Sequence, residues 1–213
     1  MSSTPIGPNK RKIVLQLAAG GLFGFVSAMA VTRALPHLDQ PTSPGAAALI
    51  AIGLIYAIMG LFVGLGVAFP GLGARLLNVV DRDDLADQRA ILTGSAVSCI
   101  SLGLALILLA LAGPEGQVSN VLAIGTLAFA LILTTAITVL QWRRYDELMR
   151  GISLEASAFM AGIAFPAIVL WAAFSQTGLA GPIDPLGLVA VLAGAMLVAT
   201  FIAAGRRGLL LPQ

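Results

Sequence analysis

Long apolar runs separated by short polar connections constrain this chain more than any other feature of its sequence. Six runs are long enough to cross a bilayer, since about 20 apolar residues in a helix span the hydrocarbon layer. They lie at 13–35, 46–70, 90–112, 118–142, 152–176 and 186–204. In a bilayer each run has to satisfy its backbone hydrogen bonds internally, as a helix does. The sequence therefore predicts an all-α, polytopic membrane protein with a single transmembrane domain over residues 1–213 and no soluble domain.

The composition excludes several classes of protein. Hydrophobic residues make up 58% of the 213 residues and charged residues 10%, whereas a soluble domain is about 45–50% apolar and about 25% charged. Cys99 is the single cysteine and His37 the single histidine, so neither an intrachain disulfide nor a bis-histidine haem can form. The sequence contains no phosphate-binding loop and no dinucleotide fingerprint. We expect no cofactor, no bound metal and no nucleic acid partner.

Positive charges are placed asymmetrically between the apolar runs. Of the 12 lysines and arginines, all but Arg33 precede the first run, follow the second or fourth run, or follow the sixth. These residues are Lys10, Arg11, Lys12, Arg75, Arg82, Arg89, Arg143, Arg144, Arg150, Arg206 and Arg207. With six spans they share one side of the membrane, which the positive-inside rule makes the cytoplasmic side. Both termini are therefore expected in the cytoplasm.

The first apolar run has a second interpretation. The basic residues before it, the apolar stretch and the small residues Ala28 and Ala30 match the pattern of a secretory signal peptide with its cleavage site. Against this, the apolar stretch continues past Ala30. Cleavage would leave five spans in the same orientation, so the rest of the topology does not depend on it.

The connection after the fourth run concentrates charge in a chain that has little. Asp146 is expected to cap the following helix by accepting a hydrogen bond from its first turn, and it stands four residues before Arg150, the spacing of a helical ion pair. Trp142 and Tyr145 fall where an aromatic belt meets the membrane surface. The simplest interpretation is a cytoplasmic loop that fixes topology and caps a helix.

Glu155 is the strongest candidate for a functional side chain. It follows Asp146 by nine residues, about 13 Å along a helix, and so enters the fifth apolar run. Carboxylates within a membrane are costly and serve proton relays or cation sites. The alternative is that Glu155 lies at headgroup level, or pairs with Arg150 or with an arginine of a neighbouring loop.

A second polar cluster follows the first run. Arg33, His37 and Asp39 are close in sequence and could bind an anion, a lipid headgroup or a metal, or form an ordinary surface turn. One histidine and one aspartate make a poor metal site, so we expect no metal here.

Small residues at helical spacing predict close packing between spans. They lie in the first three runs: Gly20, Gly24, Gly60, Gly64, Gly94, Ser95, Ser98 and Ala105. Thr134 and Thr138 are expected to bond to the backbone or to a neighbouring helix, and Pro166 to kink the fifth run. The segments 83–85 and 146–148, and the arginine pairs 143–144 and 206–207, recur at one offset. Tandem helical hairpins are therefore one arrangement to expect.

The stretch "DELMRGISLEA" resembles a motif of uncharacterised bacterial inner-membrane proteins, in which a similar stretch opens a helical hairpin. The resemblance covers about a third of the chain, and its matching residues are Asp146, Glu147, Leu148, Ile152, Leu154, Glu155 and Ala156, with Arg150 one position off the pattern. It implies a location in a bacterial inner membrane and carries no activity.

These observations favour a non-enzymatic role, as a packing, scaffold or accessory subunit of a membrane complex. Its expected partners are the lipid bilayer and other membrane subunits or a second copy. One alternative is a small transporter or channel that uses Glu155 as its proton or cation site and Pro166 as a hinge. Another is a metal-dependent enzyme acting on lipids through the loop carboxylates Asp81, Asp83, Asp84 and Asp87.

Overall fold

A computed structural model describes residues 43–69, 71, 73, 82–113, 116–182 and 184–207, with the backbone alone for 82–87. This part of the chain folds into five helices, each long and apolar enough to cross a membrane. They are α2 (Pro44–Ala68), α4 (Arg82–Ala110), α5 (Asn120–Gln141), α6 (Glu147–Gln176) and α7 (Pro185–Arg206). The predicted multi-helix membrane protein is confirmed at this level, and no strand is present in the described part. The first predicted run, 13–35, lies outside the described residues, so the count of six spans stays a prediction.

Two helices begin earlier than their apolar runs. The apolar runs begin at 90 and 152, whereas α4 begins at Arg82 and α6 at Glu147, directly after Asp146, the residue predicted to cap it. In α6 the reason is local, because the Oδ1 atom of Asp146 accepts a hydrogen bond of 2.7 Å from the backbone N–H of Met149. That capping bond satisfies one of the free donors of the first turn and fixes the helix start upstream of the apolar residues.

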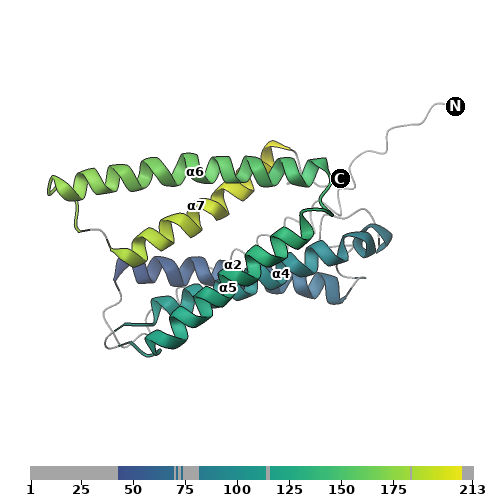
Figure 1. The fold of residues 1–213 in the computed structure, drawn as a ribbon, viewed down its shortest axis with the longest axis horizontal. Helices are drawn as coiled ribbons and strands as arrows, with labels where there is room; N and C mark the ends of the chain where they lie inside the picture. Colours follow the sequence, from purple (N-terminus) through teal and green to yellow (C-terminus); the bar gives the residue numbers. More distant parts are fainter. Residues whose placement is uncertain are drawn as a thin grey trace.

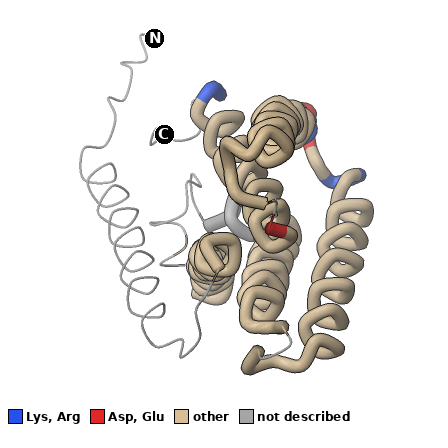
Figure 2. Tube along the Cα trace, turned by 90° about the vertical axis from the view of Figure 1, so that its left-hand side faces the viewer, with Lys and Arg blue, Asp and Glu red and all other residues tan. Residues whose placement is uncertain are grey.

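The helices pack in the order α6, α7, α2, α4, α5 (Figure 1). Helices that follow one another in the sequence run in opposite directions. As a result α4 and α6 begin, and α5 and α7 end, at the same end of the molecule, on the right in Figure 1. We call it the arginine-rich end, because Arg89, Arg143, Arg144, Arg150, Arg206 and Arg207 all belong to it. Figure 2 shows the described charges in short coloured stretches that leave most of the length of the helices uncharged. Although α5 and α6 are adjacent in sequence, they occupy opposite ends of this packing series.

Glycines bring α2 and α4 into backbone contact. A Cβ atom on Gly103 would lie 2.5 Å from the carbonyl oxygen of Gly53, and one on Gly60 would lie 2.8 Å from that of Ala96. Next to this contact Leu49 and Leu106 are fully buried in one apolar cluster. Because lipid is as apolar as leucine, close van der Waals contact of this kind is a main source of helix association in membranes. The α2–α4 pair is therefore the centre of the fold.

Side-chain hydrogen bonds join further helices. The Tyr56 hydroxyl of α2 donates to the carbonyl oxygen of Ala193 in α7 at 3.2 Å. The Gln141 amide of α5 donates to the carbonyl oxygen of Ala90 in α4 at 2.8 Å, and Gly94 leaves the space that this amide occupies. Gly94 was predicted to sit on a close-packed face, and its packing partner is this polar side chain.

The capping residues of α2 and α7 are hydrogen-bonded to each other at the end opposite the arginines. The Ser43 hydroxyl accepts a 3.1 Å bond from Ala46 N–H at the start of α2, and Asp184 Oδ1 accepts a 3.0 Å bond from Leu186 N–H at the start of α7. The Ser43 hydroxyl also donates to Asp184 Oδ2 at 3.0 Å. Gly45 lies against this carboxylate with no room for a side chain. The hydrogen bond between Ser43 and Asp184 therefore joins the start of α2 to the start of α7.

Replacing Asp184 with alanine removes the α7 cap and the link to α2 together. We expect a loss of about 2 kcal/mol in the free energy of unfolding, the upper part of the range for a helix cap. Ser119→Ala is the matched control, because Ser119 caps only α5, accepting a 3.3 Å bond from Leu122 N–H. Unfolding in detergent should show the larger loss for the Asp184 variant, and equal losses would contradict the shared cap.

Candidate functional site

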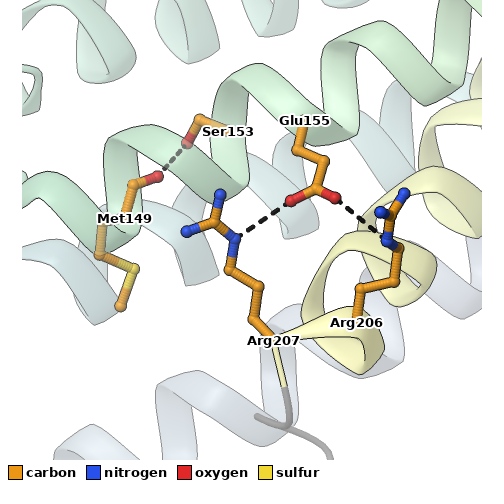
Figure 3. Close-up of polar contacts among 5 residues, drawn as sticks. All are labelled: Met149, Ser153, Glu155, Arg206 and Arg207. Atoms are coloured by element: carbon orange, nitrogen blue, oxygen red, sulfur yellow. Dashed lines mark hydrogen bonds and ion pairs between the residues drawn. The ribbon is translucent and has the colours of Figure 1, made fainter.

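Glu155 meets the end of α7 at the arginine-rich end. Its Oε1 atom lies 3.4 Å from Nε of Arg206, and its Oε2 atom accepts a 3.1 Å hydrogen bond from Nε of Arg207. Figure 3 shows the carboxylate between the two guanidinium groups. The side chain of Glu155 is 22% exposed, against 64% for Arg206 and 35% for Arg207. The three residues form an ion-pair cluster, which we call the α6–α7 clamp.

Residues of α6 hold both arginines in place. The guanidinium carbon of Arg206 lies 5.2 Å from the ring centroid of Phe159, within cation–π range. A Cβ atom on Gly151 would lie 2.8 Å from Nη2 of Arg207, so the missing side chain lets this guanidinium approach the helix. Gly151, Glu155 and Phe159 are spaced four residues apart and share one face of α6.

The length of α7 bears on the depth of the clamp in a membrane. The 22 residues of α7 extend about 33 Å, close to the thickness of about 30 Å of a hydrocarbon core. In an α7 that spans the layer, Arg206 as its last residue would lie at one boundary, and Glu155 would lie at the same depth because it contacts Arg206. The first two turns of α6 then project beyond the hydrocarbon. Of the two interpretations offered for Glu155, this geometry fits the pairing at headgroup level and not a site in mid-membrane.

Of the partners predicted for Glu155, Arg150 is bonded elsewhere, and arginines of a neighbouring segment, Arg206 and Arg207, are the observed ones. Arg150 Nη2 donates to the carbonyl oxygen of Trp142 at 3.2 Å, which ties the start of α6 back to the end of α5. Asp146 caps α6, as its position predicted. The rings of Trp142 and Tyr145 lie 6.0 Å apart, and burial raises the pKa of the Tyr145 hydroxyl above its ordinary value. Asp146, Arg150 and these aromatic residues thus organise the loop between α5 and α6.

Hydroxyl groups inside the helices bond mostly to their own backbone. Ser153 donates to the carbonyl oxygen of Met149 at 2.9 Å (Figure 3), and Thr138 to that of Thr134 at 2.8 Å. The buried Thr134 hydroxyl makes no hydrogen bond within the described structure. α6 continues through Pro166 to Gln176. None of these groups forms a continuous polar path with Glu155.

Several predicted site residues lie outside the described residues. These are Arg33 and His37, and the side chains of the loop carboxylates Asp81, Asp83, Asp84 and Asp87. Within the described part, no group of three or more histidine, cysteine, aspartate or glutamate side chains is placed to hold a metal ion.

Arg206 and Arg207 were not predicted as site residues. The sequence contains a signal for them, because charge asymmetry put Glu155 and both arginines on the same side of the membrane. What it did not supply is the packing of α6 on α7, which brings together residues 52 positions apart.

No family model, no curated protein and no solved structure matches this chain. Its function is therefore inferred from the geometry alone.

Proposed function

We propose that this chain is a non-catalytic subunit of a larger membrane assembly and that one face of α6 contacts the neighbouring subunit. We call it the outer face of α6 and define it by Leu154, Ala158, Gly162, Phe165 and Val169. These exposed residues follow the helical period, and the buried residues of α6, Ala156 and Ala164, lie on the opposite side.

The observation that carries the proposal is the exposed small pair Ala158 and Gly162. A Cβ atom on Gly162 would meet nothing of the described chain within 4 Å, whereas glycines of α2 and α4, such as Gly53 and Gly103, are in tight contact with another helix. Small residues four apart are the pattern that lets two membrane helices approach closely. Small residues bring α2 and α4 together within the molecule. The outer face of α6 has the same pattern of small residues beside large exposed side chains, Phe165 among them.

The clamp supports a structural role for Glu155 over the transporter alternative. Both carboxylate oxygens already contact arginines of α7, so a transported cation would have to displace a guanidinium group. The clamp also fixes α6 to α7, which keeps the outer face of α6 in a defined position.

The arginine-rich end supports a finer statement about orientation. We propose that it faces the cytoplasm of a bacterial inner membrane, because the described arginines gather at one end of the helices. The capped end with Ser43 and Asp184 then faces the other side.

Gly162→Leu tests the proposed contact. Leucine would fill the space that a partner helix needs while leaving the fold intact, because nothing in the described chain lies within 4 Å of a Cβ atom at that position. Purification of the tagged protein in mild detergent, followed by mass spectrometry, should recover a stoichiometric partner with wild type. We expect at least tenfold less of this partner with the variant, because a loss of about 1.4 kcal/mol of binding free energy weakens binding tenfold.

Gly125→Leu is the matched control. Gly125 lies in α5 and is also exposed, and a Cβ atom added to it would likewise meet nothing within 4 Å. The substitution is therefore the same in chemistry and in helical context, and it should leave the partner bound. Equal recovery from all three proteins would exclude the outer face of α6 as the contact.

A further inference from the structure

The α6–α7 clamp contains more positive than negative charge. One carboxylate, that of Glu155, faces two guanidinium groups, those of Arg206 and Arg207. An ion pair of equal charges would need one arginine only. The cluster therefore carries a net formal charge of about +1, from two guanidinium groups and one carboxylate.

Both arginines retain unused hydrogen-bond donors. Each contacts Glu155 through Nε, and their Nη1 and Nη2 groups make no hydrogen bond or ion pair with another described residue. The guanidinium group has five donors in a planar fork that matches the oxygens of a phosphate. Contacts with Glu155, Gly151 and Phe159 restrict the two arginines in advance, so little further ordering is needed when an anion binds.

The depth of the cluster indicates where the anion comes from. Arg206 ends a helix whose length matches the hydrocarbon layer, so its guanidinium group lies at the level of lipid phosphates, and its side chain is 64% exposed. From charge, free donors and depth together we infer that Arg206 and Arg207, positioned by Glu155, form a binding site for a phosphate group, that of an anionic lipid headgroup. This inference does not depend on the proposed protein partner.

The test uses the full chain in nanodiscs that contain equal amounts of phosphatidylglycerol and phosphatidylcholine. Native mass spectrometry then counts the lipids that stay bound after release. Wild type should retain phosphatidylglycerol over phosphatidylcholine, because a cationic site repels the ammonium group of choline. Arg206→Lys keeps the charge and the pair with Glu155 but loses the planar guanidinium donors, and should retain about tenfold less phosphatidylglycerol than wild type.

Arg144→Lys is the control for charge alone. Arg144 is exposed in the loop between α5 and α6 at the same end of the molecule. Its variant should retain as much phosphatidylglycerol as wild type. Arg207→Lys is the second test variant, and the thermal midpoint of each protein shows whether it is folded. Wild-type retention of phosphatidylglycerol in both clamp variants, or an equal fall in the Arg144 variant, would overturn the site.

Inorganic phosphate distinguishes the two sources of the anion. In the same nanodiscs, millimolar phosphate should leave phosphatidylglycerol bound if the site takes a lipid. Displacement of the lipid by phosphate, absent in the Arg206→Lys protein, would support the same phosphate chemistry with a free anion as its source. No preference in wild type and no effect of phosphate would overturn the inference.

Discussion

Gly103→Leu is expected to prevent the protein from reaching its folded state. A Cβ atom at this position would already lie 2.5 Å from the Gly53 carbonyl oxygen and 2.6 Å from the Ala57 backbone nitrogen. These are backbone atoms, so α2 and α4 would have to separate, and the packing that buries Leu49 and Leu106 would be lost with them. Overpacking costs about 1–3 kcal/mol even where side chains can adjust. We expect at least the upper value here, a large part of the stability of a typical domain.

Size-exclusion chromatography in mild detergent and thermal unfolding provide the measurement. Gly103→Leu should elute as aggregate or melt far below wild type, and Gly103→Ala should lie between the two. Gly125→Leu, at an open position of α5, should keep the wild-type profile because helix propensity rises and nothing is displaced. A stable, monodisperse Gly103→Leu protein would contradict the close α2–α4 contact.

Glu155→Lys is expected to separate the end of α7 from α6. The substitution places a third cation beside Arg206 and Arg207, whose Nε atoms lie within 3.4 Å of the present carboxylate. Removing one partner of an exposed ion pair costs about 0–1 kcal/mol, and removing one partner of a buried pair costs about 3–5 kcal/mol because the other charge is left uncompensated. For this partly exposed cluster, with repulsion added to the lost attraction, we expect a loss of about 2 kcal/mol in the free energy of unfolding.

A charge exchange distinguishes a clamp from a transport site. Glu155→Lys combined with Arg207→Glu restores opposite charges across the α6–α7 contact, and should recover at least half of the lost stability. Proton flux in liposomes should be the same for wild type and both variants. No recovery in the double variant, together with a proton flux that only wild type supports, would favour the transporter alternative.

The positions of the helices could be predicted from the sequence because lipid exposure and backbone hydrogen bonding both depend on local composition. The run 186–204 became α7, Pro185–Arg206, with only small changes at its ends. The apolar runs begin later than α4 and α6 do, because charged residues extend a helix beyond the membrane without adding apolar length. Asp146 was identified correctly, since a capping bond spans three residues and depends on no other helix.

Contacts between helices could be predicted only in part. Gly60 was singled out and packs against Ala96 and Ile100 of α4, but Gly53 and Gly103 were not recognised as the centre of the same contact. One sequence does not indicate which of several small-residue faces meet. For the same reason Glu155 was found as an unusual carboxylate, whereas its pairing with Arg206 and Arg207 follows only from the packing of α6 on α7.

The packing order also explains why the proposed contact lies on α6. α6 packs on α7, while the next helix in sequence before it, α5, packs on α4 at the other end of the series. Both terminal helices of the series have exposed large side chains, such as Val121 and Phe165. α6 combines them with an open pair of small residues four positions apart, Ala158 and Gly162, beside a clamp that fixes its position.

The most direct test of the account is the mass of the assembly taken from the membrane. Native mass spectrometry of the tagged full chain, released from its own membrane in nanodiscs without prior detergent, measures that mass. We predict a complex that contains this chain and at least one further polypeptide, which the Gly162→Leu substitution removes and Gly125→Leu does not. A chain that carries lipid alone in all three samples would contradict its role as a subunit.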